Sequence, residues 1–184
     1  AGYNANIITR LKLEPDQKAR AQLATFFASY AHPIDTLGIS LVAGRNFRPD
    51  EITAIGPNDK MSPPGIIVTR SLAHKLFPEG SALGKTVYLP DGPAAIIGIL
   101  ASLQGPLRNS RTMDGFTVLV PTHYLDPAGV VYLVRTDATA MKPVIAATLK
   151  ALQERSGVRI IDPKTGVVTM AKARERAYAD DHSV

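Results

Sequence analysis

Apolar and polar residues alternate at the start of the chain, as they do in a strand that is buried on one face. The alternation runs from Ile7 to Leu13 and predicts a strand over these residues. Pro15 and Asp16 then mark the start of a helix, which Pro33 would end. The apolar residues in between recur at steps of three and four and predict one buried stripe, made of Ala19, Leu23, Phe26, Phe27 and Tyr30.

Short apolar runs, separated by proline, glycine and polar residues, fill the middle of the chain. Pro78 would end a helix there, and the run Pro90-Asp91-Gly92-Pro93 is typical of a hairpin turn. Two segments, 48–65 and 102–115, lack periodicity and are predicted to be exposed loops. The predicted elements of this region are strands over 39–43 and 65–69, a helix over 71–77, and a hairpin of strands over 86–89 and 94–100.

The last third of the chain contains a strand, a helix and a strand in that order. The predicted elements are strands over 116–120 and 130–135, a helix over 139–155, a strand over 158–161 and a helix over 170–181. The longer helix would bury a stripe of Met141, Val144, Ile145, Leu149 and Leu152. Together with the strand and helix over 7–31, this order indicates two similar units that flank a different central segment.

Composition indicates a folded domain with an aliphatic core. Of the 184 residues 45% are hydrophobic and 20% are charged, so the chain is expected to fold. Aromatic residues amount to 6% and Trp is absent, which favours a layered fold of helices and strands. The absence of Cys excludes disulfides, thiolate zinc sites and a cysteine nucleophile. No stretch approaches the roughly 18 consecutive apolar residues of a spanning helix, and a start without Met is expected of a piece of a longer protein.

The net charge of +5 makes nucleic acid or an anionic membrane surface a candidate partner. The basic residues are scattered, however, and Glu175 interrupts the densest run, Lys172, Arg174 and Arg176. This pattern favours the charged face of a helix that lies in water or at a membrane surface. Aromatic signatures of RNA-binding modules are absent. No nucleic-acid partner is therefore expected.

The run Gly80-Ser81-Ala82-Leu83-Gly84-Lys85-Thr86 looks like a phosphate-binding loop, in which glycines let backbone N–H groups surround a phosphate. Only three residues separate its glycines, where the motif needs four. A predicted strand also follows, in place of the helix whose N-terminus would face the phosphate. We interpret the run as a structural turn and predict no cofactor.

Other candidate catalytic and metal-binding residues do not combine into a site. Ser71 and His74 share a predicted helix but have no partner carboxylate, and helix capping accounts for Ser71. The carboxylate pairs Asp50-Glu51 and Asp180-Asp181 are expected to be solvated. No two histidines have metal-ligand spacing, since they stand far apart at His32, His74, His123 and His182. We therefore predict neither catalytic nor metal-binding residues.

Three motifs follow one another between Leu37 and Val87. They are the run from Leu37 to Phe47, which ends in Gly44-Arg45-Asn46-Phe47, the run from Ile66 to Pro78, and Ala82-Leu83-Gly84-Lys85-Thr86-Val87. In this order they resemble the MacB-like periplasmic core domain of ABC-transporter permeases of the MacB, FtsX and LolC type. The strand from Ile96 to Leu100 and the run Val134-Arg135-Thr136 fit the same family. Thr69 departs from the family pattern, which usually has Asn there.

The resemblance implies an α+β fold with two lobes. Residues 1–36 and 116–184 would form a βαβ-rich, porter-like lobe, and residues 37–115 an inserted, mixed α/β, sabre-like lobe. No catalytic residue is carried over from the family. The family motif would serve the fold through Gly44, Arg45, Phe47, Leu76, Phe77, Gly84 and Lys85.

The resemblance also implies a location and a function. The domain would lie in the periplasm, between the first two transmembrane helices of a permease. A cytoplasmic ATPase would drive those helices, and the domain would move with them to gate or export a substrate without catalysing a reaction itself. The implied partners are its own transmembrane helices and ATPase, a second permease protomer and a periplasmic adaptor.

Two other functions stay open from the residues alone. One is a free periplasmic hydrolase, with a site assembled from residues 46–64 and 102–115, and the other is a ligand-binding sensor or adhesion module. Long loops on a rigid scaffold often bind partners, although they are equally often tolerated insertions. Arg108 and Arg111 are the predicted partner-contact residues.

Overall fold

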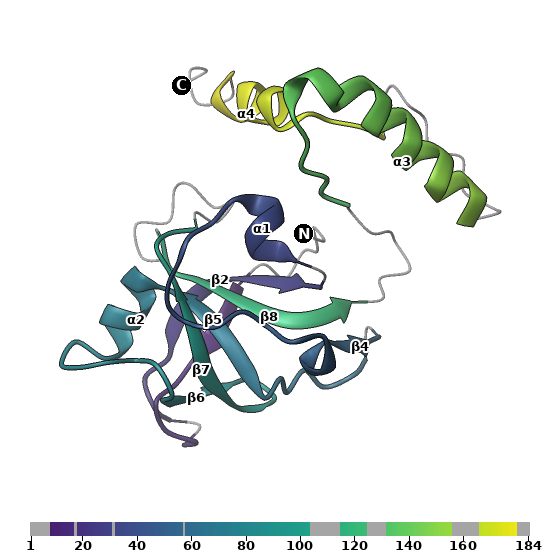
Figure 1. The fold of residues 1–184 in the computed structure, drawn as a ribbon. Helices are drawn as coiled ribbons and strands as arrows, with labels where there is room; N and C mark the ends of the chain where they lie inside the picture. Colours follow the sequence, from purple (N-terminus) through teal and green to yellow (C-terminus); the bar gives the residue numbers. More distant parts are fainter. Residues whose placement is uncertain are drawn as a thin grey trace. The chain divides into compact units, whose positions relative to one another are not determined.

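The computed structural model describes seven ranges of the chain, residues 8–16, 18–30, 32–56, 58–103, 115–124, 132–155 and 166–179. The chain divides into two compact units, which are Ala1–Val134 and Arg135–Val184. The first unit holds all the described strands and two short helices, and the second unit holds two longer helices (Figure 1).

A sheet of eight strands forms the first unit. Its order is β1-β2-β8-β5-β7-β3, with β4 paired to β8 and β6 paired to β7. Three pairs are parallel, β2 with β8, β4 with β8 and β5 with β7, and the other pairs are antiparallel. The strands are β1 (Ile8–Leu11), β2 (Gln22–Ser29), β3 (Leu41–Gly44), β4 (Thr53–Ile55), β5 (Gly65–Thr69), β6 (Thr86–Leu89), β7 (Gly92–Leu100) and β8 (Thr117–Tyr124).

The sheet closes on itself through a bridge between Lys12 and Tyr88. The Lys12 amide donates to the Tyr88 carbonyl at 3.0 Å, and the Tyr88 amide donates to the Lys12 carbonyl at 2.8 Å. Lys12 directly follows β1 and Tyr88 lies in β6, so pairing runs around the circuit β1-β2-β8-β5-β7-β6 and back to β1. A closed circuit removes the free edges of these six strands along the paired residues.

The main core lies inside this circuit, since all six of its strands contribute buried apolar side chains. Helix α2 (Arg70–Leu76) adds three more from the same side. Most of these side chains are aliphatic, as the low aromatic content predicts. The core consists of Leu11, Ala24, Ile66, Val68, Leu72, Ala73, Leu76, Ala82, Val87, Leu89, Ala94, Ile96, Val118 and Val120.

A second, smaller core lies on the opposite face of the central strands. Ile67 of β5 and Leu119 of β8 alternate with residues of the main core and therefore point the other way. Helix α1 (Pro33–Leu37) covers this face through Ile34. The segment that leads into and out of β3 covers it as well, through Leu41 and Phe47.

The second unit contains the 3₁₀ turn η2 (Ala138–Ala140) and helices α3 (Met141–Arg155) and α4 (Met170–Ala179). The predicted stripe of α3 is half-buried, and no residue of this helix is fully buried. Thr169 accepts a hydrogen bond from the Lys172 amide at 3.2 Å and so caps the start of α4.

Most of the predicted elements are confirmed. The strands over 39–43, 65–69, 86–89 and 94–100 match β3, β5, β6 and β7 within a few residues, and the helices over 71–77, 139–155 and 170–181 match α2, α3 and α4. The strand over 116–120 is confirmed and continues to Tyr124 as the rest of β8. The predicted loop over 48–65 contains the 3₁₀ turn η1 (Pro49–Glu51) and β4.

Two predicted elements are wrong. The helix between Pro15 and Pro33 does not form, because residues 22–29 are β2, which pairs with β1 on one side and β8 on the other. The strand over 130–135 is absent from its described part, residues 132–135, which pair with no strand. The strand predicted over 158–161 and most of the loop over 102–115 lie outside the described residues.

The mixed α+β class is confirmed. The division into lobes of residues 1–36 with 116–184 and of residues 37–115 stays a prediction. In the sheet, β8 pairs with β2 and also with β5, so strands assigned to the two lobes share one sheet.

Candidate functional site

Gly44 ends β3 at a point where the chain has no room for a side chain. Its φ of +75° lies in the left-handed region, and it pairs with Gly98 of β7. A Cβ atom at Gly44 would collide with the carbonyl oxygen of Ile97 and would lie 2.6 Å from Leu83 Cδ1. The close approach lets the Arg45 amide donate to the Ile97 carbonyl at 2.9 Å, which fixes where the next residues start.

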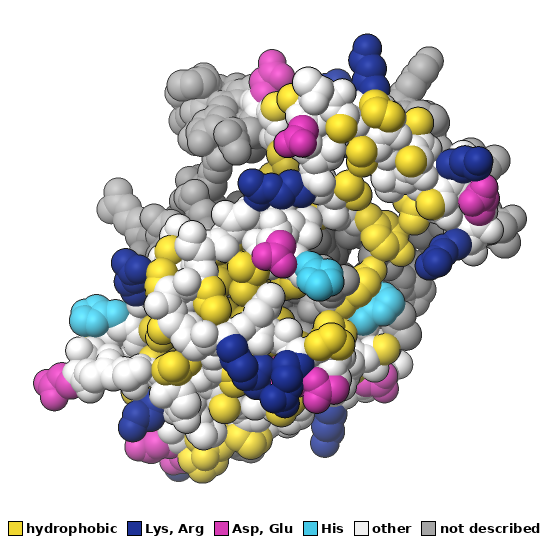
Figure 2. Space-filling model, in the orientation of Figure 1, with side chains coloured by type: hydrophobic (Ala, Val, Ile, Leu, Met, Phe, Trp, Pro, Cys, Tyr) yellow, Lys and Arg dark blue, Asp and Glu magenta, His cyan; other side chains and the backbone are white. Residues whose placement is uncertain are grey.

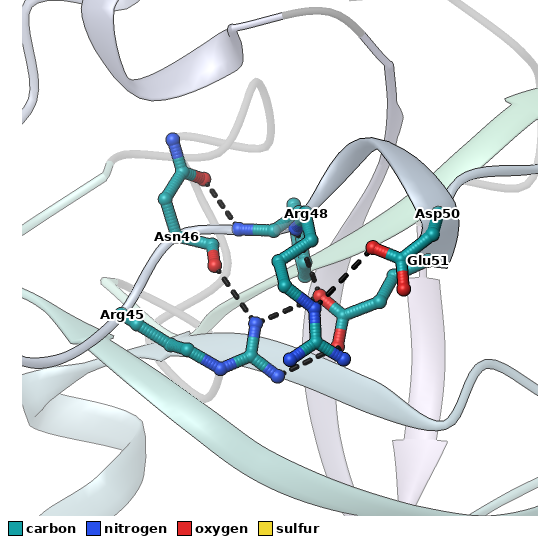
Figure 3. A network of polar contacts seen from close by, with 6 residues as sticks. Arg45, Asn46, Arg48, Asp50 and Glu51 are labelled. Carbon is teal, nitrogen blue, oxygen red and sulfur yellow. Dashed lines mark hydrogen bonds and ion pairs between the residues drawn. The ribbon is translucent and has the colours of Figure 1, made fainter.

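The residues after Gly44 form a compact polar network, shown in Figure 3. The guanidinium of Arg45 donates to both carboxylate oxygens of Glu51, at 2.8 and 2.6 Å. The Arg48 amide donates to Glu51 Oε2 at 2.8 Å, and the Arg48 guanidinium lies 3.4 Å from Glu51 Oε1. Arg48 Nε also donates to Asp50 at 3.3 Å. Two cations and two carboxylates thus neutralise one another.

Glu51 is the buried centre of this network. Its side chain is only 9% exposed, whereas that of Arg45 is 43% exposed. The hydrogen bonds from Arg45 outweigh the effect of burial and, helped by the Arg48 amide, lower the pKa of Glu51 from 4.5 to about 2. The same hydrogen bonds raise the pKa of Arg45. A carboxylate held this firmly in its charged form is unsuited to proton transfer at neutral pH.

The expectation that Asp50 and Glu51 are both solvated is wrong for Glu51. Asp50 is 73% exposed, as expected, but Glu51 is enclosed by the turn η1. A local signal for this lies in the sequence, since Pro49 occupies the first position of η1 and Glu51 the third. Glu at that position bonds back to the amide that precedes the turn.

Replacing Glu51 by Gln is expected to lower the free energy of unfolding at neutral pH by about 1.5–3 kcal/mol, because charge-assisted hydrogen bonds are lost. The pKa of Glu51 is lower in the folded state than in the unfolded state. Its contribution is therefore complete above about pH 4.5 and disappears as the pH falls towards about 2. Urea unfolding over this pH range measures the difference between wild type and variant.

Asp50→Asn is the matched control, since it removes a neighbouring carboxylate charge that is exposed, and it should change stability by less than about 1 kcal/mol. A difference between wild type and Glu51→Gln that stays constant from neutral pH down to pH about 2 would contradict this role of Glu51.

The remaining family-motif residues lie in or beside the two cores. Phe47 is half-buried in the second core, and its amide donates to the Asn46 side chain at 2.8 Å. Leu76 is buried at the end of α2, and Phe77 packs on the main core. The amide of Gly84 donates to the Ile96 carbonyl at 2.8 Å, while Lys85 has an exposed side chain and joins the sheet through its backbone.

Thr69, where the family usually has Asn, is completely buried and joins three segments. Its hydroxyl donates to the Gly115 carbonyl at 2.6 Å and accepts from the Thr117 amide at 3.1 Å. Ser71 donates to the same Gly115 carbonyl at 2.5 Å, so the interpretation of Ser71 as a helix cap is wrong. Thr69, not Ser71, is the residue that precedes the first turn of α2.

The other candidate residues stay apart. His32 and His74 are exposed, and His123 stacks on Tyr30 with 4.0 Å between ring centroids. Within the described ranges, no three His, Cys, Asp or Glu side chains are grouped so that they could hold a metal ion. Arg108, Arg111, His182 and the pair Asp180-Asp181 lie outside the described residues.

The surface of the described residues fits the scattered charge seen in the sequence. Figure 2 shows Lys and Arg side chains at separate points over the face that it draws, with Asp or Glu close to several of them. The helices in the described part of the chain are all too short or too polar to cross a membrane.

The arrangement of residues 44–51 can fix a backbone but offers no reacting group. The Arg45 guanidinium is engaged by Glu51, and the missing side chain at Gly44 lets the backbones of β3 and β7 approach closely. The predicted turn over residues 80–86 is followed by β6, which confirms that a strand stands where a phosphate-binding loop needs a helix.

Comparison with known proteins gives one family. The model described as "MacB-like periplasmic core domain" matches residues 7–159. No curated protein sequence matches the chain.

Similar solved structures include the extracellular domain of the noncanonic ABC-type transporter YknZ from Gram-positive bacteria. Its identity is 18%, the match covers 83% of this chain and 73% of that one, and the TM-score is 0.49. The periplasmic region of MacB from Actinobacillus actinomycetemcomitans is 15% identical over 96% of this chain and 73% of that one, with a TM-score of 0.48.

Proposed function

Because this chain belongs to the family of MacB-like periplasmic core domains, we propose that it couples ATP hydrolysis in the cytoplasm to the movement or export of a substrate. The family match is the observation that carries the proposal. Residues 7–159 include every strand of the sheet and the whole of α3. The family is one of periplasmic domains of ABC-transporter permeases, and in our proposal the ATPase acts from the other side of the membrane.

The closed circuit of strands supports a mechanical role. Leu11 of β1, Ile96 of β7 and Val118 of β8 are all 0% exposed and meet in one core. Cores packed to crystal-like density have low compressibility and transmit displacement rather than absorb it. The first unit, which holds this core, is therefore suited to move as one body.

We propose that the domain is not itself an enzyme. Among the described residues, Ser71 is bonded to a backbone carbonyl. His32 lies 3.9 Å from the Asp35 carboxylate, but both side chains are exposed, and His123 packs on the ring of Tyr30. Glu51, the most strongly perturbed carboxylate described, is neutralised by Arg45 and Arg48. A screen of the chain against esters, amides, phosphoesters and glycosides is expected to show no turnover, and robust turnover that a single substitution abolishes would favour the hydrolase alternative.

The proposed partners are the permease's own transmembrane helices and ATPase, a second permease protomer and a periplasmic adaptor. Arg108 and Arg111 remain the predicted contact residues. The described residues that border their segment are hydrogen-bonded, since Thr117 Oγ1 donates to the Leu103 carbonyl at 2.7 Å and Thr69 donates to the Gly115 carbonyl at 2.6 Å.

Reversing the charge of Arg108 and Arg111 together, as R108E and R111E, is expected to reduce copurification of a partner protein with the full-length permease about tenfold. Two exposed charge pairs of about 0.7 kcal/mol each account for that factor. Lys18→Glu with Arg20→Glu is the matched control, because it makes the same change of charge at two exposed residues elsewhere. Equal losses for both double variants, or no loss for either, would contradict a specific contact.

The function itself is tested in the full-length permease reconstituted with its ATPase. Removal of residues 7–159 is expected to leave ATP hydrolysis but abolish substrate handling, because the part that acts outside the membrane is gone. As a control, the intact permease and the version without residues 7–159 must be present in the membrane in equal amounts. Equal ATP hydrolysis together with equal substrate handling would refute the proposal.

A further inference from the structure

A strap of irregular backbone, residues 58–64, leads from β4 to β5 and lies against the start of β7. The Met61 amide donates to the Asp91 carboxylate at 3.0 Å, which ties the strap to the turn between β6 and β7. Ser62 lies beside Gly92, where an added Cβ atom would come within 2.8 Å of the serine hydroxyl oxygen. The strap therefore rests on the hairpin of β6 and β7 before it enters β5.

The Met61 side chain connects the middle of the strap to the interior of the first unit. It is half-buried and packs on the main core, whereas the flanking residues Lys60 and Ser62 are exposed. Asp91 is exposed as well, so its hydrogen bond to the Met61 amide is open to water and contributes modestly. The packing of this one side chain therefore contributes much of what keeps the middle of the strap closed.

Methionine is the only source of sulfur in the chain, which has four Met and no Cys. Of the methionines that the structure describes, Met61 is the one that packs on the main core, since Met141 and Met170 belong to the second unit. Oxidation turns a flexible, apolar thioether into a polar sulfoxide. A sulfoxide oxygen held against aliphatic side chains loses its hydrogen bonds to water. The closed strap is therefore less favourable once Met61 is oxidised.

We propose that Met61 is an oxidation site whose modification releases the middle of the strap from the main core. Hydrogen peroxide transfers one oxygen atom to the half-buried sulfur. The sulfur gives up two electrons and becomes a sulfoxide, while the peroxide is reduced to water. The end of the strap stays in place, because the Ala95 amide donates to the Pro64 carbonyl at 3.1 Å. The site does not depend on the proposed role in transport.

Trypsin cleavage after Lys60, followed by mass spectrometry, tests this site in the complete 184-residue chain. Treatment with hydrogen peroxide is expected to speed this cleavage about tenfold, because proteolysis follows the population of the open strap and the packing of Met61 is lost. Cleavage after Lys85, whose carbonyl accepts from the Ile96 amide in the sheet, should be unchanged. Methionine sulfoxide reductases with dithiothreitol should restore the slow cleavage.

Three variants separate Met61 from the other methionines. Met61→Leu keeps an apolar side chain that peroxide does not oxidise, so its cleavage after Lys60 should be slow with or without peroxide. Met61→Gln places a polar amide against the core and should be cleaved quickly without peroxide. Met170→Leu is the matched control, since Met170 is 62% exposed, and it should respond to peroxide as the wild type does.

Equal acceleration by peroxide in the wild type and in Met61→Leu would overturn the proposal, because another residue would then be responsible. A Met61 that stays unoxidised while Met170 is converted would overturn it, and so would an oxidised Met61 with unchanged cleavage after Lys60. An equal increase after Lys85 would contradict it as well, since oxidation would then loosen the whole first unit. The peroxide comparison uses the wild type and the conservative leucine variant, so it decides the question even if Met61→Gln fails to fold.

Discussion

Replacement of Gly44 by Ala is expected to lower the free energy of unfolding by about 3 kcal/mol. Two costs add at this position, since the left-handed backbone costs a non-glycine residue about 1–2 kcal/mol and overpacking costs about 1–3 kcal/mol. The added methyl group would collide with the Ile97 carbonyl and with Leu83, and the carbonyl belongs to the backbone of β7, which is paired with β3 and β5 and cannot give way cheaply. Urea unfolding followed by circular dichroism measures the change.

Gly84→Ala separates the two costs. Gly84 has nearly the same φ, +78°, but a Cβ atom there would meet nothing within 4 Å. This variant should lose only the backbone term, about 1 kcal/mol. Equal losses for both variants would show that β3 does not approach β7 as closely as described, and the role of Gly44 in the family motif would then be only that of a turn.

Leu11→Ala is expected to be the other strongly destabilising change, with a loss of about 2–5 kcal/mol. Leu11 is 0% exposed and is the residue through which β1 enters the main core. It directly precedes Lys12, whose backbone bridge to Tyr88 closes the circuit of strands. A cavity at this position would therefore weaken the closure as well as the packing.

Leu13→Ala removes the same atoms two residues further along, where the side chain is 47% exposed. This control should change stability by less than about 1 kcal/mol. If the two leucine variants unfold at the same urea concentration, then β1 does not pack on the main core and the circuit of strands is open at β1.

The sequence pattern predicts β1 and fails for β2, and burial explains the difference. One face of β1 is exposed, as Ile8 shows at 44%, while Leu11 on the other face is fully buried. The alternation is therefore visible. Strand β2 has neighbours on both sides and no exposed residue, so its apolar residues fill both faces. The spacing of Leu23 and Phe26 then resembles a helical stripe, and it outweighs the strand preference of Thr25 and Phe26.

The order of the strands lies beyond what local patterns contain. Strand β8 pairs with β2 up to Pro121 and with β4 from Thr122 onwards, although these partners are distant in the sequence. The predicted strand over 130–135 has the right apolar composition, yet its described residues find no partner. A strand needs a neighbour, and a single sequence does not say which neighbours are available.

The glycines of the candidate site were predictable from the sequence, whereas its ion pair was not. Gly44 and Gly84 stand out in the sequence, because only glycine fits left-handed turns between apolar runs. The ion pair between Arg45 and Glu51 is harder to foresee, since it depends on the turn at Pro49 that brings a residue six positions later back onto the guanidinium.

We propose that the domain transmits movement between membrane helices and substrate. The most direct measurement is the amount of substrate moved per ATP hydrolysed by the full-length transporter, with and without a flexible Gly-Ser insertion after Val134, where the first unit ends. An insertion of equal length after the exposed Lys60 is the control. Mechanical coupling predicts that only the insertion after Val134 lowers this ratio while ATP hydrolysis continues. An unchanged ratio in both variants would contradict it.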